Sequence, residues 1–219
     1  NEIPNAPEVF SVLLLRIDNF NNRLYLLDFA NFAIKSNQKP SLICYQLHDE
    51  SNNNNHNNKD KLLFRYEFPS HIAGMGSMLN DFQISSDGNF IVIVDTSIVA
   101  YTPAIIIFDV KKRISFRVLS SVKYLYGQSA FMKIPTGKPN HPFLYWPNLG
   151  ALGVKIHVDS IALSRDNEIL YFGALTNDML LALPMKELLK YTINSNLTTD
   201  SILSEDINTQ LLKRVSQFN

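Results

Sequence analysis

The sequence predicts an all-β fold, because one pattern of strand, polar turn and strand occurs three times along the chain. The three copies lie at residues 15–28, 79–95 and 158–173. Their turns are rich in Asp, Asn and Ser, whose side chains satisfy the backbone of tight turns. Further apolar strands follow at 41–47, 104–110 and 179–183, and a fourth strand closes the first two units at 62–68 and 114–119. Repeated units of four antiparallel strands are typical of the blades of a β-propeller.

The spacing of the units indicates how much of a propeller is present. The first turn residues, Asp18, Ser85 and Ser164, are 67 and 79 residues apart. Compact blades have about 40–50 residues, so these blades carry long loops. A propeller closes with about 4–8 blades, whereas the chain has room for three, at 10–69, 74–120 and 154–219. We therefore expect residues 1–219 to form a single incomplete propeller domain, whose open sheet edges are covered by the remaining blades or by another chain.

Within the first unit, the Asn-rich tract at residues 51–60 has no apolar residue and is predicted to be a mobile surface loop.

Cys44 is the single cysteine and lies in an apolar strand, where it is expected to be a small buried hydrophobic residue. In the second unit, residues 90–94 are all apolar, as expected for a strand between neighbouring blades.

The segment from residue 120 to residue 153 is predicted to be long and irregular. Loops of this length in a compact domain are commonly functional. Four aromatic residues of the segment are candidates for stacking on a small ligand: Tyr124, Tyr126, Tyr145 and Trp146.

After Pro184 the pattern changes from strand to helix. Residues 185–190 and 205–215 are predicted to form a short helical insertion near the C-terminus. Ser204 is a suitable N-cap for the second helix, in which Leu211 and Val215 share one side.

An ordered set of short runs resembles the major royal jelly/yellow protein family. The runs are RLYLLD at 23–28, PSLICYQL at 40–47, LND at 79–81, IFDV at 107–110, FRV at 116–118, DSIALS at 159–164 and LYF at 170–172. The helical tail also looks like an insertion found in microbial members. This resemblance implies a six-bladed propeller, of which about three blades are present, related in architecture to regucalcin-like and gluconolactonase-like propellers. It further implies secretion, with members that bind small amines or convert dopachrome, so family membership indicates the fold better than the function.

Charge and hydropathy exclude some classes of function. The chain has 20 basic and 20 acidic residues and a formal net charge of zero, which argues against a nucleic-acid-binding protein and against electrostatic attachment to membranes. No apolar run approaches the ~18–20 residues of a membrane span. The sequon at 196–198 is consistent with export, whereas the absence of a disulfide is less typical of secreted proteins.

Two polar residues occupy equivalent places in the repeat. Asn80 and Asp159 stand at the head of the innermost strand of their blades, and Leu13 is the equivalent residue in the first blade. The heads of innermost strands converge on the central channel of a propeller. In regucalcin-like propellers an Asn or Asp at the matching place ligates a divalent metal, and oxygen donors suit Ca²⁺, Mg²⁺ or Mn²⁺. Here Ser160 replaces the usual Gly after Asp159, which argues against a lactonase-like pocket.

His157 is the one candidate for a catalytic base. It lies two residues before Asp159, so in a regular strand both side chains point to the same face. A His–Asp pair of this kind acts as a general base with its orienting carboxylate. The alternative is structural, with the Asp and Asn side chains satisfying backbone donors. Asp28 and Asp95, at the ends of equivalent second strands, are expected to be rim or turn residues.

The sequence therefore predicts a yellow/royal-jelly-like propeller that binds a small molecule at its central channel. The alternative is an enzyme of the same fold, either a dopachrome-converting isomerase or a metal-dependent lactonase-like hydrolase. An enzyme should show three convergent channel ligands or a perturbed His–Asp pair beside a pocket. The sequence supplies only Asn80, Asp159 and the neighbouring His157. A scaffold for protein partners is a third hypothesis.

Overall fold

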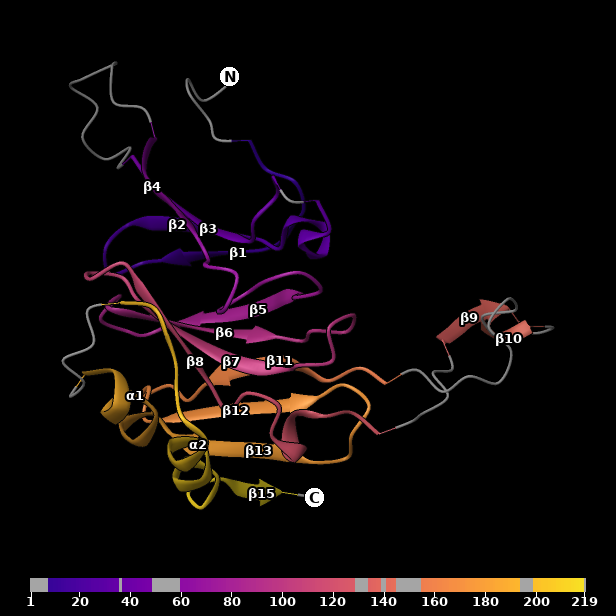
Figure 1. Cartoon of the computed structure of the whole chain (residues 1–219). Coiled ribbons are helices and arrows are strands. Elements are labelled where there is room, and N and C mark those ends of the chain that lie inside the picture. Colours follow the sequence, from indigo (N-terminus) through magenta and orange to yellow (C-terminus); the bar gives the residue numbers. More distant parts are fainter. Residues whose placement is uncertain are drawn as a thin grey trace.

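The computed structural model describes residues 8–35, 37–48, 60–128, 134–138, 141–144, 155–193 and 199–218. Three twisted sheets follow one another through the molecule (Figure 1). Their innermost strands are neighbours in space, which is the arrangement expected for consecutive propeller blades. The predicted β-propeller fold is confirmed. The tract at 52–58, Tyr145, Trp146 and the sequon lie outside the described residues.

Blade one is formed by β1 (Val12–Asp18), β2 (Arg23–Asp28), β3 (Ser41–Gln46) and β4 (Lys61–Glu67). The strands are antiparallel and pair in the order of the chain. A short 3-10 turn, η1 (Ala30–Ala33), follows β2.

Blade two contains β5 (Leu79–Ile84), β6 (Phe90–Asp95), β7 (Ala104–Asp109) and β8 (Ile114–Val118), again antiparallel and in order. A fifth strand, β14 (Ser201–Ile202), is added in parallel to β8. The sequence placed Ser201–Ile202 in the third blade, and the structure differs because this segment returns to cover the outer edge of blade two. Covering an exposed sheet edge removes a site for unwanted strand pairing.

Blade three is formed by β11 (Val158–Leu163), β12 (Ile169–Ala174), β13 (Leu180–Pro184) and β15 (Ser216–Phe218). The two predicted helices lie between β13 and β15: α1 (Met185–Ile193) and α2 (Glu205–Leu212). Ser204 caps α2, because its side chain accepts a hydrogen bond from the backbone N–H of Ile207 at 3.4 Å.

The described residues of the segment at 120–153 include regular structure that the sequence did not predict. It begins with a 3-10 turn, η2 (Lys123–Leu125), and contains an antiparallel hairpin of β9 (Ile134–Lys138) and β10 (His141–Leu144). Pro135, Gly137 and Pro142 weaken the usual strand pattern, which explains why the hairpin was not expected.

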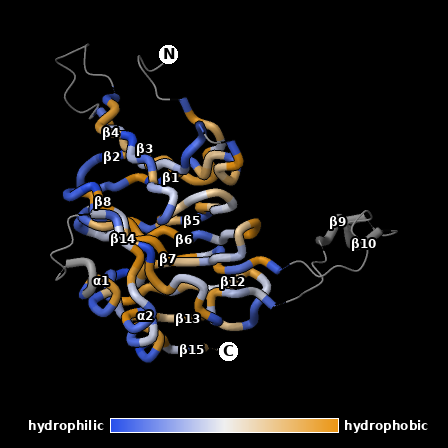
Figure 2. The backbone as a smooth tube through the Cα atoms, viewed as in Figure 1, coloured by the Kyte–Doolittle hydropathy of each residue, from blue (hydrophilic) through white to orange (hydrophobic). Residues whose placement is uncertain are grey.

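The hydrophobic core lies between the sheets. Hydrophobic stretches run along the strands of the middle sheet, and polar residues gather at the turns (Figure 2). One cluster joins blades one and two and includes Tyr25, Phe82 and Phe108. A second cluster joins blades two and three and includes Phe116 and Phe172. Cys44 is buried in the first cluster, as predicted.

The turns of blades two and three repeat in atomic detail. The Ser85 hydroxyl donates to Asp87 and accepts from the N–H of Phe90 at 2.9 Å. Ser164 makes the equivalent bonds with Asp166 and Ile169. The polar turn residues thus fix each hairpin in the way that the sequence repeat suggested.

In the part of the chain that the structure describes, no helix is long and apolar enough to cross a membrane.

Candidate functional site

Each innermost strand has a bulge at the same place. The pairing register shifts between Val12 and Leu14 in β1, between Leu79 and Asp81 in β5, and between Val158 and Ser160 in β11. The residues inside these shifts are Leu13, Asn80 and Asp159, which the repeat had aligned. A bulge locally redirects side chains, and bulges occur often beside functional sites.

Asn80 and Asp159 contact each other across the boundary between blades two and three. The Asn80 amide donates to the Asp159 carboxylate at 2.7 Å and to the Asp159 backbone carbonyl at 3.2 Å. Burial raises the pKa of Asp159, and the charge of nearby Asp81 raises it further, whereas the Thr96 hydroxyl acts in the opposite direction. The Asp159 carboxylate is thus held near a second negative charge, that of Asp81, while the Asn80 amide donates a hydrogen bond to it.

Further polar side chains join the three innermost strands. The Arg16 guanidinium in β1 contacts the Asp81 carboxylate at 2.8 Å and donates to the Phe82 carbonyl. In the next junction, the Gln83 amide donates to the Ile161 carbonyl at 2.9 Å. Together these five residues form what we call the polar seam: Arg16, Asn80, Asp81, Gln83 and Asp159. With one guanidinium and two carboxylates, the ionised seam carries one net negative charge.

His157 directly precedes β11 and is fully buried. Its Nδ1 accepts a hydrogen bond from the Gly127 N–H at 3.2 Å, which assigns the proton of the neutral ring to Nε2. The rings of Tyr101 and Tyr126 pack edge-on against it, at centroid distances of 4.8 and 5.0 Å. Burial lowers the pKa of His157, and the charge of Lys155 adds to this effect. The neutral imidazole is therefore the favoured form.

The structure gives His157 and Asp159 different surroundings. No described contact joins the two side chains, although their spacing suggested a common face. The bulge at Asp159 interrupts the two-residue alternation on which that expectation rested.

The two described aromatic candidates of the segment 120–153, Tyr124 and Tyr126, lie in different environments. The Tyr126 hydroxyl donates to the Tyr101 carbonyl at 3.0 Å, beside His157. Tyr124 packs against the core between blades two and three, and the Lys123 ammonium lies 4.7 Å from its ring centre. Of the two aromatic candidates of this segment that the structure describes, Tyr126 is therefore the one grouped with a predicted channel residue.

Asp28 and Asp95 hold the segments that lead into the innermost strands. The buried Asp28 carboxylate accepts from the N–H groups of Phe10, Ser11 and Ala30 at 2.8–2.9 Å. Asp95 accepts from the N–H of Met78 at 2.9 Å. These carboxylates satisfy backbone donors, which is a structural role.

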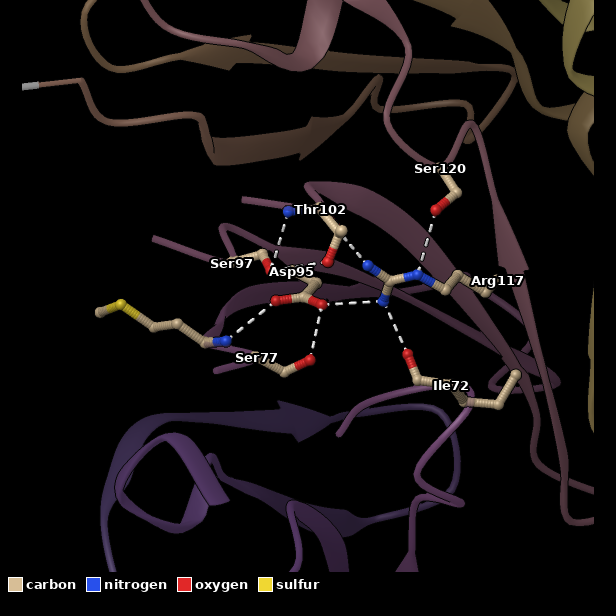
Figure 3. A network of polar contacts seen from close by, with 8 residues as sticks. Ile72, Ser77, Asp95, Ser97, Thr102, Arg117 and Ser120 are labelled. Carbon is tan, nitrogen blue, oxygen red and sulfur yellow. Dashed lines mark hydrogen bonds and ion pairs between the residues drawn. The ribbon is translucent and has the colours of Figure 1, made fainter. Parts of the chain in front are cut away.

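Asp95 also belongs to a buried network around Arg117 (Figure 3). The guanidinium contacts Asp95 at 2.8 Å and donates to the carbonyls of Ile72 and Thr102. The Ser77 hydroxyl donates to the same carboxylate at 3.0 Å. The network joins the segment before β5, the end of β6 and strand β8.

The donors of the polar seam fit a divalent cation poorly. Asp81 is already paired with Arg16, and Asn80 directs its NH₂ group toward Asp159. Ca²⁺ takes six to eight oxygen ligands, and the adjacent guanidinium repels a doubly charged ion more strongly than a singly charged one. Within the described ranges, no group of three or more His, Cys, Asp or Glu side chains could hold a metal ion.

Sequence reasoning missed Arg16, Asp81, Gln83 and Tyr101. A signal for two of them was present, since Arg16 and Gln83 occupy the same position of the repeat and both are polar. Tyr101 gave no such signal, because only the tertiary fold brings it against His157.

Sheets of four antiparallel strands, stacked so that their innermost strands are neighbours, define the β-propeller class. Comparison with family models matches residues 10–217 to the major royal jelly protein family. The chain belongs to this family. A search of curated proteins found no match.

Comparison with solved structures also found similar chains. Hydrazine synthase from Kuenenia stuttgartiensis has a TM-score of 0.50 and 11% identity over 91% of this chain and 44% of that one. The Cps50 (Swd1) β-propeller domain from Myceliophteria thermophila has a TM-score of 0.39 and 10% identity, covering 79% of this chain and 38% of the other. The periplasmic gluconolactonase PpgL of Pseudomonas aeruginosa has a TM-score of 0.36 and 8% identity, with 78% and 37% covered. The chain thus spans less than half the length of each.

Proposed function

We propose that the chain binds a small aromatic amine, in its protonated form, at the channel end of the polar seam. The observation that carries the proposal is the position of the Asp159 carboxylate in the bulge of β11, where it accepts from the Asn80 amide at 2.7 Å. Burial and the charge of Asp81 raise the pKa of this carboxylate. A protonated amine between Asp159 and Asp81 would offset their repulsion and the net negative charge of the seam.

Two aromatic side chains pack on His157, which precedes Asp159 by two residues in the chain. Tyr101 is about half exposed, at 51%, and packs on His157, which is two residues from Asp159. Tyr126 also packs edge-on against the same imidazole. Tyrosine faces attract cations and stack on aromatic rings, which favours an amine that carries an indole, phenol or catechol ring.

The same geometry favours binding over the enzymatic alternative. The candidate base His157 uses Nδ1 to accept from Gly127 and has no described contact with the Asp159 carboxylate that would orient it. Since family members are commonly secreted, we also propose an extracellular location for this chain.

Calorimetric titration of the purified chain with tyramine, dopamine and tryptamine tests the proposal. We expect these amines to bind at least about tenfold more tightly than phenol, catechol and indole, because a hydrogen bond to a charged group contributes about 1.5–3 kcal/mol. Asp159→Asn should remove this preference. The matched control, Asp166→Asn in the exposed turn of the same blade, should retain it. Equal affinity for charged and neutral compounds, or full binding by Asp159→Asn, would contradict the proposal.

The pH dependence gives a second test. Because the pKa of Asp159 is raised, the carboxylate takes up a proton at a higher pH than an ordinary Asp. Amine affinity should therefore fall as the pH drops through that raised pKa. An affinity that is constant from neutral pH down to the ordinary range of Asp, about 3.9, would contradict a role for Asp159.

A further inference from the structure

A group of polar side chains that does not belong to the polar seam lies between blades one and two. Tyr25, Cys44 and Phe64 form a row across three strands of blade one, since β2 pairs with β3 and β3 with β4 at these residues. The row packs against blade two, where the ring of Phe64 lies 6.2 Å from that of Phe108. Arg23 is two residues before Tyr25 in β2, so it lies on the same face of the strand.

Blade two supplies a second guanidinium to this group. Arg113 is in the turn between β7 and β8, and its Cζ lies over the Phe64 ring, 3.3 Å from the ring centre. Stacking uses the face of a guanidinium and leaves the N–H groups at its edge able to donate. Burial lowers the pKa of Arg113, and the charge of Arg23 lowers it further. We call Arg23, Tyr25, Cys44 and Arg113 the inter-blade cluster.

Two buried donors of the inter-blade cluster lack partners within the part of the chain that the structure describes. The Tyr25 side chain is fully buried, and its hydroxyl has no hydrogen-bond partner. The Nε of Arg23 is also enclosed without a partner. Buried polar groups in folded proteins are nearly always hydrogen-bonded, because an unsatisfied donor costs stability. These two donors therefore suit an acceptor that a ligand supplies.

The inter-blade cluster is positively charged. Neither of its guanidiniums forms an ion pair with a carboxylate among the described residues. Burial raises the pKa of the Cys44 thiol to about 11, so this group is uncharged at neutral pH. The charge of Asp18 also acts on Cys44, but this carboxylate accepts three hydrogen bonds within its own turn, from Phe20 and Asn21. Two guanidiniums and one carboxylate leave the region with one net positive charge.

We propose that a small tetrahedral oxyanion, phosphate or sulfate, binds between Arg23 and Arg113 and bridges blades one and two. Guanidinium groups bind such anions through paired N–H groups, and one anion can accept from two of them. The Tyr25 hydroxyl adds a neutral donor from the buried side. The anion offsets the repulsion between the two guanidiniums and satisfies the enclosed donors. The site is separate from the polar seam, because its side chains come from β2, β3 and the β7–β8 turn.

Calorimetric titration of the 219-residue chain with inorganic phosphate, at constant pH and ionic strength, tests the proposal. Wild type should bind phosphate with a saturable heat. Arg23→Met should weaken binding at least about tenfold, because it removes hydrogen bonds from a charged donor. Arg113→Lys should weaken it less, since lysine keeps the charge but not the planar pair of donors. The matched control is Arg165→Met, at an exposed position in the turn between β11 and β12, which should bind as wild type does.

Tyr25→Phe isolates the buried hydroxyl, because it leaves both guanidinium charges in place. The hydroxyl has no partner in the described chain, so its removal should not lower the melting temperature in sodium chloride. The rise in melting temperature on adding phosphate should be smaller than in wild type. Phosphate also stabilises proteins by exclusion from their surface, and this contribution is the same in every variant. The difference between wild type and Tyr25→Phe therefore reports the site.

Glycerol 3-phosphate is titrated in parallel, because the same donors would contact a phosphate ester. Tighter binding of the ester identifies a phosphorylated small molecule as the occupant, and tighter binding of inorganic phosphate identifies the ion itself. A heat that does not saturate overturns the proposal. Equal phosphate affinity in wild type and Arg23→Met also overturns it, since the ion then binds elsewhere. Unchanged affinity in Tyr25→Phe contradicts the site as described.

Discussion

The Asp95 carboxylate and the Arg117 guanidinium form an ion pair of 2.8 Å in the interior of blade two, where their side chains are 0% and 6% exposed. Both groups are further satisfied by hydrogen bonds, to Ser77 and Met78 on one side and to Ile72 and Thr102 on the other. A charge in this environment is stable only while its partner is present.

Replacing Arg117 by Met should therefore destabilise the fold strongly. The change leaves the Asp95 charge buried and unpaired, for which a loss of about 3–5 kcal/mol is typical. Urea unfolding measures the loss. The control is Lys112→Met, which removes an exposed partner of Asp109 at 3.8 Å and should cost less than about 1 kcal/mol. Equal effects of the two substitutions would show that the buried pair is not important.

Asp200→Ala should weaken the attachment of β14 to the rest of the molecule. One Asp200 carboxylate oxygen accepts from the N–H of Ser115 at 2.6 Å, from its hydroxyl at 2.8 Å and from the Tyr66 hydroxyl. Leaving these donors without a partner should cost about 1–3 kcal/mol. Thermal unfolding and amide exchange at Ser115 measure the effect. Asp178→Ala, at an exposed position, is the control, and an unchanged Ser115 exchange rate would refute the predicted attachment.

Asp159 should make the folded state less stable as the pH rises. Its pKa is raised in the folded protein, so the folded state binds its proton more tightly than the unfolded state does. The stabilisation is complete below the ordinary pKa of an Asp and is lost as the pH rises through the raised value. Wild type should therefore gain stability relative to Asp159→Asn when the pH is lowered from 7 to about 4. A difference in melting temperature that is constant over this range would contradict the raised pKa.

Divalent cations should not stabilise the polar seam. The donors fit a metal poorly, so the melting temperature of wild type should be the same in calcium, magnesium, manganese and chelator. Asp159→Ala should shift it by one constant amount in all four. A cation-dependent stabilisation that disappears in Asp159→Ala, of roughly 2.7 kcal/mol at 100 times the dissociation constant, would instead establish a metal site.

The fold could be predicted because its signals are local. Alternating apolar residues and turns such as Ser85–Asp87 specify hairpins without reference to the rest of the chain. The equivalence of Asn80 and Asp159 followed from the same repeat. The ion pair of Arg16 with Asp81 could not be predicted, because it depends on how one blade is positioned against the next. Likewise β14 has only two paired residues, too few for any periodic pattern.

The parallel pairing of β14 with β8 bears on how this protein is made. Ser115 and Asp200 are 85 residues apart in the chain, yet they meet at one edge of blade two. During synthesis, that edge stays open until the region around Asp200 has left the ribosome, by which time most of blade three has been translated. Because such non-local contacts form late and slowly, β8 of the nascent blade two stays unpaired at its outer edge while most of blade three is being made. Chaperone capture during translation should therefore concentrate on the nascent chain between the emergence of β8 and that of β14.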